Sequence, residues 1–394
     1  MRDTRRFVTV VGVLVILVAT AIAASSQSSS IFGGPFSNLT PDQLALFEAG
    51  SEDFQEVEEV EDGLGPVFNE ASCATCHSQP AVGGGSTRLE TRFGRLNGRS
   101  FDPMVESGGS LLQDQGIGRV GRYKYDAERV PREATIVAQR RTTPLFGLGL
   151  VDAVSDATFE QLARMQERST PETAGRVSMV IDLANKNKIS VGKFGWKAQV
   201  PTLFQFAADA YLNEMGITNP LFPNENCPQG DCSALQGNPV PDLNDDGTGV
   251  TNFANFMTLL APPPRGPITA DVTAGEAIFR SIGCANCHVP ALKTGHHSVR
   301  VLANQTFFPF SDFLLHDMGS LGDGIAQGDA TGKEMRTAPL WGLRAITTFL
   351  HDGRAKSAEE AIQAHDGQGL DARNKFNSLD KRSKSLLGSF LDSL

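Results

Sequence analysis

The pattern of apolar and polar positions opens with one long apolar run, residues 7–24, which follows three arginines and precedes a serine-rich stretch. A basic start, an apolar run and small residues at its end form the layout of a secretory signal, and Ala21-Ile22-Ala23 suits cleavage. The run is also long enough to span a bilayer, so an uncleaved membrane anchor remains an alternative. Residues 1–24 are therefore predicted to be a signal peptide or an N-terminal anchor, and the remaining chain is expected in the periplasm or otherwise outside the cytoplasm.

Two later segments combine a helix-start signal with apolar positions at helical spacing. Thr40-Pro41-Asp42 precedes the segment 43–54 and puts proline at an early helical position, and Ala270-Asp271 begins a segment that runs through residue 279. Elsewhere, 40 glycines and 21 prolines interrupt the pattern and predict long irregular loops. We therefore expect a mainly α fold with long irregular loops.

Each predicted helix precedes a Cys-x-x-Cys-His motif, and the residues of the two motifs are Cys73, Cys76, His77, Cys284, Cys287 and His288. This spacing is the attachment signature of c-type haem, in which the two thiols bond the vinyl groups and the adjacent histidine ligates the iron. The motifs use four of the six cysteines, which makes a chance origin a poor explanation. A zinc site would need more ligands nearby, yet no histidine lies between His77 and His288. The sequence therefore predicts two covalently bound haem c groups.

The two remaining cysteines, Cys227 and Cys232, bracket the short sequence Pro-Gln-Gly-Asp. Exported compartments are oxidising, so closely spaced cysteines outside a haem motif tend to pair there. We predict a local, structural disulfide between them.

The charge balance limits the partners of this chain. Forty-five acidic residues against 35 basic ones give a formal net charge of −10 at pH 7. Nucleic-acid binding needs a basic stripe that the sequence lacks, so no nucleic-acid partner is expected. An acidic surface suits a basic protein partner.

An eight-residue segment recurs in the two halves of the chain. Residues 141–148 and 336–343 are identical at six of eight positions, and each copy lies downstream of its own haem motif. The proline-rich segment 262–269 is the predicted linker. The chain is thus predicted to contain two cytochrome c-like haem domains related by an internal repeat, residues 31–261 with insertions and residues 270–394.

Several longer motifs add to this repeat, namely Gly65-Pro66-Val67-Phe68-Asn69, Leu315-His316-Asp317-Met318-Gly319 and Leu350-His351-Asp352-Gly353-Arg354-Ala355. Together they resemble the dihaem oxidoreductase family, which is related to bacterial dihaem cytochrome c peroxidases and to the dihaem enzyme that matures methylamine dehydrogenase. The resemblance implies a peroxidase-like enzyme that reduces hydrogen peroxide at the N-terminal haem. Many relatives hold a displaceable distal histidine on that haem, but no histidine lies between His77 and His288 here, so we expect its sixth position to be open. Electrons would pass through the C-terminal haem from a small electron-donor protein, a cytochrome c or a cupredoxin.

The resemblance also implies roles for single residues. Trp196, Gln205 and Glu214 follow one another in the family's order, which makes Trp196 the residue between the haems and Glu214 the acid and base above the peroxide-binding haem. His365 takes the place of the family's Met or Tyr as the distal ligand of the second haem. A bis-His haem has a lower potential than a His/Met haem, because a thioether favours ferrous iron. The other candidates for that position are His351, His316, Met318, Met335, His296 and His297.

A calcium ion is a further implication of the resemblance, because related peroxidases hold one between their haems through backbone carbonyls. Thr337 and Pro339 have the required spacing. The segment 242–247 also resembles the start of a calcium loop, but Phe253 stands where the bidentate acid is expected, so a solvated acidic turn remains open.

Two other functions remain open at this stage. A purely electron-transferring dihaem cytochrome would need a sixth ligand on both irons. An oxygenase of the rubber-oxygenase type would keep the first haem open and bind dioxygen.

Overall fold

The computed structural model describes residues 32–98 and 100–394, so the predicted signal peptide or anchor, residues 1–24, lies outside the described residues. Among the described residues, 37% are helical and 17% are extended, so the predicted mainly α class is not confirmed. In the described part of the chain, no helix has the length and apolar character needed to cross a membrane.

Ten α-helices occur among the described residues: α1 Pro41–Asp53, α2 Cys73–Cys76, α3 Leu148–Asp152, α4 Asp156–Ser169, α5 Leu203–Met215, α6 Thr248–Leu259, α7 Ala270–Ser281, α8 Ala358–Ala364, α9 Leu370–Asn377 and α10 Lys381–Leu391. Both predicted helices are confirmed. The Thr40 side chain accepts from the Gln43 N–H and the Gln43 side chain accepts from the Thr40 N–H, which forms a capping box at the start of α1. The Thr269 side chain caps α7.

The strands are short, apart from β2 and β8: β1 Val67–Phe68, β2 Leu89–Asn97, β3 Ser100–Asp102, β4 Leu111–Leu112, β5 Gln115–Gly116, β6 Gly118–Val120, β7 Tyr123–Tyr125, β8 Ile136–Arg141, β9 Ser178–Asp182, β10 Lys188–Gly192, β11 Leu292–Lys293, β12 Thr306–Phe307, β13 Leu315–Asp317 and β14 Glu334–Arg336. In the largest sheet, β2 pairs antiparallel with β3, β4 and β8. This sheet carries charged side chains toward the first haem motif, as described below.

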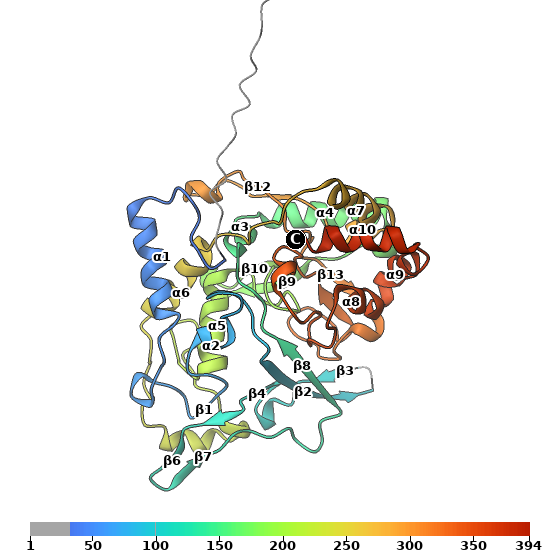
Figure 1. Cartoon of the computed structure of the whole chain (residues 1–394). Coiled ribbons are helices and arrows are strands. Elements are labelled where there is room, and N and C mark those ends of the chain that lie inside the picture. The colour runs from blue at the N-terminus through green and yellow to red at the C-terminus, as the bar shows by residue number, and fades with distance from the viewer. Residues whose placement is uncertain (1–31, 99) are drawn as a thin grey trace, which may run out of the picture.

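Two hydrophobic clusters form the main cores. The larger one is built around α1, α5 and α6 and includes Phe54 and Phe256, and the smaller one joins α7 to α10 through Phe279 and Phe390. Figure 1 shows α1, α5 and α6 on one side of the molecule and α7 to α10 on the other. The larger core also contains side chains from residues 292–314, so the cores do not follow the predicted linker at 262–269.

The repeated segments share a local backbone conformation. Strand β8 ends at Arg141 and β14 ends at Arg336, the first residues of the two copies. Gly147 and Gly342 then adopt left-handed conformations, with φ of 72° and 76°, and each precedes a helical turn. A side chain at Gly147 would also clash with Pro262, because an added Cβ would lie 2.9 Å from its Cα. Glycine is therefore required there on two counts.

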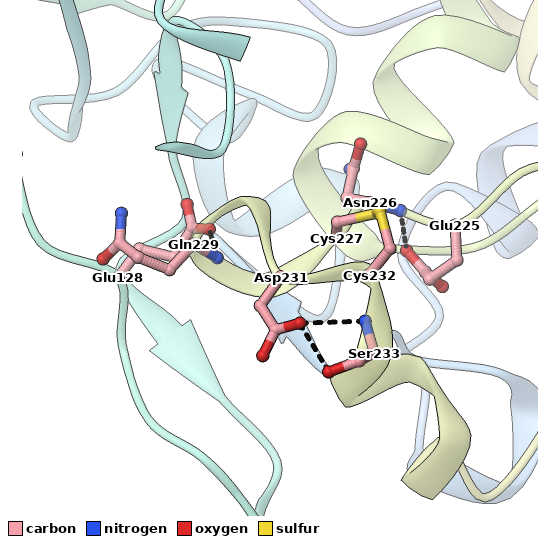
Figure 2. The surroundings of a disulfide bond; sticks show 8 residues. All are labelled: Glu128, Glu225, Asn226, Cys227, Gln229, Asp231, Cys232 and Ser233. Atoms are coloured by element: carbon pink, nitrogen blue, oxygen red, sulfur yellow. Dashed lines mark hydrogen bonds between the residues drawn. A yellow bond between two sulfur atoms is a disulfide. The ribbon is translucent and has the colours of Figure 1, made fainter. Parts of the chain in front are cut away.

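The predicted disulfide between Cys227 and Cys232 is confirmed, and Figure 2 shows its surroundings. Inside the loop, the Asp231 carboxylate accepts hydrogen bonds from the N–H and hydroxyl of Ser233, at 2.9 and 2.6 Å. The Gln229 N–H donates to Glu128 at 2.6 Å, which fastens the loop to the segment after β7. The pair is structural, as expected.

Candidate haem sites and the wall between them

The first Cys-x-x-Cys-His motif lines a cavity of about 180 Å³. The single helical turn α2 carries Cys73 and Cys76 three residues apart, which puts both thiols on one side of the turn. His77 Nδ1 donates to the carbonyl of Gly84 at 2.9 Å, which leaves Nε2 free to bind a metal. Two unpaired thiols beside one oriented imidazole fit a c-type haem.

The second motif lines a larger cavity of about 270 Å³, and His365 lies opposite His288 in it. His288 Nδ1 donates to Phe310 O at 3.0 Å and His365 Nδ1 donates to Ala361 O at 2.7 Å, so both Nε2 atoms are free. The centres of the two rings are 6.5 Å apart. Imidazole–metal bonds of about 2 Å on each side of one ion would separate the ring centres by about 6 Å. The pair therefore fits an iron held between two histidines.

The competing ligand candidates are arranged differently. His316, His351, Met318 and Met335 line the second cavity, whereas His296 and His297 line neither cavity. His316 Nε2 is 3.0 Å from Asp312 Oδ2, and its Nδ1 is 3.4 Å from Cys287 Sγ. Burial alone would lower the pKa of His316, but the Asp312 carboxylate holds it well above its ordinary value. Both ring nitrogens of His316 are therefore engaged by protein groups, whereas the Nε2 of His365 has no such partner among the described residues.

Trp196 belongs to the wall that separates the two cavities. Five residues line both cavities: Arg141, Thr143, Gly195, Trp196 and Phe206. The indole N–H of Trp196 donates to the carbonyl of Arg141 at 2.8 Å, and its ring lies 6.2 Å from that of His351. The structure thus brings Trp196 to the position between the sites that the resemblance implied.

Glu214 lies in the last turn of α5 and lines the first cavity together with His77. The Asn69 amide donates to Glu214 Oε2 at 2.7 Å, and the Asn69 N–H donates to the Glu214 carbonyl at 2.7 Å. Burial and the nearby carboxylate of Glu90 together raise the pKa of Glu214 to about 7, although the hydrogen bond from Asn69 lowers it. A carboxyl group in this cavity can therefore gain or lose a proton near neutral pH.

A comparison with protein families shows to which family the chain belongs. The model of the family described as "Di-haem oxidoreductase, putative peroxidase" matches residues 126–394, more than half of the chain. The chain belongs to the di-haem oxidoreductase family. It is accordingly an oxidoreductase with haem cofactors, and the two cavities are its candidate haem sites.

Three solved structures are weakly similar to this chain in sequence and in structure. Hydrazine synthase from Kuenenia stuttgartiensis is 13% identical, with 100% of both chains covered and a TM-score of 0.40. A MauG-like protein associated with microbial copper homeostasis is 12% identical, with 92% of this chain and 91% of that chain covered and a TM-score of 0.41. The diheme peroxidase BthA from Burkholderia thailandensis is 15% identical, with 89% and 86% covered and a TM-score of 0.39. No curated protein matches the chain significantly.

Several charged residues of the first haem site were not predicted from the sequence, among them Glu90, Arg92 and Asp209. Glu90 and Arg92 come from β2, and Asp209 comes from α5. Arg92 Nε donates to Glu90 Oε1 at 2.8 Å. Burial alone would raise the pKa of Glu90, but the pairing with Arg92 holds this pKa below its ordinary value. For Asp209, burial raises the pKa to about 6. The alternation of charged residues along β2 was the only signal for this part of the oxidoreductase site.

Gln205, which the resemblance placed among the catalytic residues, lies outside both candidate haem sites. Its side-chain oxygen accepts from the N–H of Leu183 at 2.8 Å, and its amide donates to the carbonyl of Ile181 at 3.2 Å. Gln205 does not line either cavity. The side chain instead fastens α5 to the turn between β9 and β10.

The structure shows what surrounds the backbone carbonyl of Thr337, one of the two predicted calcium ligands. The carbonyl of Thr337, paired in that prediction with Pro339, accepts from the Ser311 hydroxyl at 2.7 Å and from the Arg336 guanidinium at 3.1 Å. The Thr337 carbonyl thus already has two hydrogen-bond donors from the protein, one of them cationic. Within residues 32–98 and 100–394, no group of three or more His, Cys, Asp or Glu side chains could hold a metal.

The acidic segment 242–247 caps a helix. The Asp245 carboxylate accepts from the N–H groups of Gly249 and Val250, at 2.9 and 3.4 Å, in the first turn of α6. The open alternative of an acidic turn is therefore the better description of this segment.

Proposed function

We propose that this di-haem oxidoreductase reduces hydrogen peroxide in the first cavity, with electrons that enter at the second site. The proposal includes covalent attachment of both haems through the cysteines of the two motifs. The observation that carries it is the position of Glu214, a carboxyl group with a pKa raised to about 7, in the same cavity as the free Nε2 of His77.

Hydrogen peroxide takes up two electrons and two protons and leaves as two molecules of water. Bound haem supplies a redox-active iron that can exchange these electrons. Glu214 moves the proton: its ionised form accepts a proton from one peroxide oxygen and returns it to the oxygen that leaves. Asn69 orients the carboxylate through its 2.7 Å hydrogen bond. Arg92 keeps the neighbouring Glu90 ionised, and the negative charge of Glu90 contributes to the raised pKa of Glu214.

Electrons reach the first cavity through the wall that contains Trp196. At the second site, His288 and His365 would both hold the iron of a bound haem, which would leave it no position for peroxide and would suit it to electron storage. The net charge of −10 suits a small basic donor protein, such as a cytochrome c or a cupredoxin. We further propose that the protein works in the periplasm or otherwise outside the cytoplasm, and that residues 1–24 direct its export or anchor it to the membrane.

Peroxide consumption by the purified protein with both haems tests the proposal. We expect two reduced donor molecules to be oxidised for each peroxide consumed. A Cys73→Ala/Cys76→Ala variant is expected to lose peroxide consumption, because it lacks the first haem. A Cys284→Ala/Cys287→Ala variant is expected to keep peroxide binding and to lose turnover with the donor. Peroxide turnover that survives in the first variant would contradict the proposal.

One observation favours a competing function. Met215 and Met257 also line the first cavity, and a thioether from either could become the sixth ligand of the first iron. The protein would then be an electron-transferring cytochrome without catalysis. Met215 Sδ, however, packs against Cys73 Sγ at 3.9 Å, which occupies it on the side of the attachment motif.

A further inference from the structure

The ammonium group of Lys197 is enclosed by oxygen atoms. Its Nζ donates to the backbone carbonyls of Glu334, Thr331 and Gly332, at 2.6, 3.0 and 3.4 Å. It also lies 2.9 Å from Asp323 Oδ1. The Lys197 side chain is 0% exposed and that of Asp323 is 1% exposed. An ammonium group has three protons to donate, so this environment satisfies all of them.

Asp323 is shared between two cations. Arg140 Nε donates to Asp323 Oδ2 at 2.7 Å, and Arg140 Nη1 donates to Gln327 Oε1 at 2.6 Å. Arg140 lines the first cavity, whereas Lys197 follows Trp196 directly in the chain. A buried charge is stable only when it is paired and hydrogen-bonded, and this cluster meets both conditions.

The cluster fixes the segment that carries Trp196. On one side of Trp196, Lys197 binds the loop before β14 through its three carbonyls. On the other side, Arg336 Nε donates to the carbonyl of Gly195 at 2.7 Å, and the Arg336 N–H donates to the carbonyl of Trp196 at 2.9 Å. The wall between the cavities is thus held to the C-terminal half of the chain by two cationic side chains.

Three backbone carbonyls and one carboxylate are the kind of ligands that a hard metal cation would bind. We propose that the Lys197 ammonium is the resident cation of the wall between the two haem sites and takes the place of a metal ion there. The resemblance proposed the carbonyl of Thr337 as a calcium ligand, but this carbonyl accepts a hydrogen bond from the Arg336 guanidinium. This second protein cation near the wall supports the assignment. The inference does not depend on peroxide reduction, because it concerns what holds the wall together.

Removing the ammonium tests this inference, because it leaves an oxygen-lined site for an added cation. The unfolding temperature of Lys197→Ala, with both haems bound, is expected to fall by roughly 5–10 °C, since Asp323 loses a buried partner. Potassium chloride is expected to recover at least half of this loss, relative to choline chloride at the same ionic strength. The nitrogen–oxygen distances of 2.6–3.4 Å suit potassium better than calcium, which prefers about 2.3–2.6 Å.

Two control variants test whether the stabilisation by potassium arises at the site of the Lys197 ammonium. Lys333→Ala removes an exposed lysine from the same loop and is expected to behave like the wild type, with no potassium response. Lys197→Ala/Asp323→Asn is expected to lose the response that Lys197→Ala shows, because its carboxylate ligand is gone. A Lys197→Ala protein that no added cation stabilises would overturn the proposal.

If Lys197→Ala fails to fold, the metal content of the wild-type protein still tests the proposal. We expect elemental analysis to find no stoichiometric calcium, and a chelator to leave the unfolding temperature unchanged. One equivalent of calcium, with a loss of stability on chelation, would show that a metal holds the wall and would overturn the proposal.

Discussion

Replacing Glu214 by Gln is expected to lower peroxide turnover by a factor of roughly 10² to 10⁴, the range of a lost general acid–base group. The amide keeps the size of the side chain and cannot accept or return a proton. The hydrogen bond from Asn69 can be kept, so the loss would report on proton transfer instead of on packing. Stopped-flow measurement of peroxide consumption by the reduced protein checks this result.

The pH profile separates this role from a structural one. The pKa of Glu214 is raised to about 7, so the ionised form that accepts the proton grows as pH rises through that value. The wild-type kcat/KM for peroxide is therefore expected to rise with pH around 7 and then level off, and Glu214→Gln is expected to lose this rise. Asn69→Ala should move the rise to higher pH, because its donated hydrogen bond stabilises the carboxylate and lowers the pKa.

A matched control is available in another buried acid. Burial raises the pKa of Glu225 to about 8, but this residue does not line either cavity. Glu225→Gln should therefore leave both the rate and the pH profile unchanged. Full turnover in Glu214→Gln, with the wild-type pH profile, would remove Glu214 from the mechanism.

The second large effect is expected at the second haem site. Replacing His365 by Met should raise the potential of that haem by on the order of 100 mV, a fraction of the roughly 0.8 V range that axial ligation covers. The reason is that a thioether favours ferrous iron, whereas a second imidazole stabilises ferric iron. A spectroelectrochemical titration of the Soret band measures the shift.

His297→Met is the matched control for this prediction. His297 follows the same haem motif but lines neither cavity, and its Nδ1 accepts from the N–H of Val299 at 3.0 Å. Its replacement should leave both potentials unchanged. If His365→Met has wild-type potentials and an unaltered low-spin signal, His365 is not the ligand.

The features that the sequence predicted correctly are those with short, chemically fixed spacing. The helix starts at Thr40-Pro41-Asp42 and at Ala270-Asp271 depend only on neighbouring residues, and so does the disulfide between Cys227 and Cys232. His365 and Trp196 were placed through the order of family motifs, and the structure brings them to the second cavity and to the wall.

The features that were missed depend on contacts between distant segments. Glu90 reaches the first cavity only through the pairing of β2 with β8, and nothing in its local sequence indicates that register. Gln205 was assigned by its position in the chain, but tertiary packing turns it toward the hairpin of β9 and β10. Lys197 shows its role only when the loop at residues 331–334 encloses it. Such contacts are set by the folded chain as a whole, so a local pattern does not reveal them.

Low-temperature EPR of the oxidised protein, before and after the addition of peroxide, directly tests whether the first haem is open and reacts with peroxide. We expect a high-spin ferric signal from the first haem, because His77 is the one histidine among the described residues that lines the first cavity, together with a low-spin signal from the haem between His288 and His365. Peroxide should remove the high-spin signal. Two low-spin signals that do not respond to peroxide would contradict the account and identify the protein as an electron carrier.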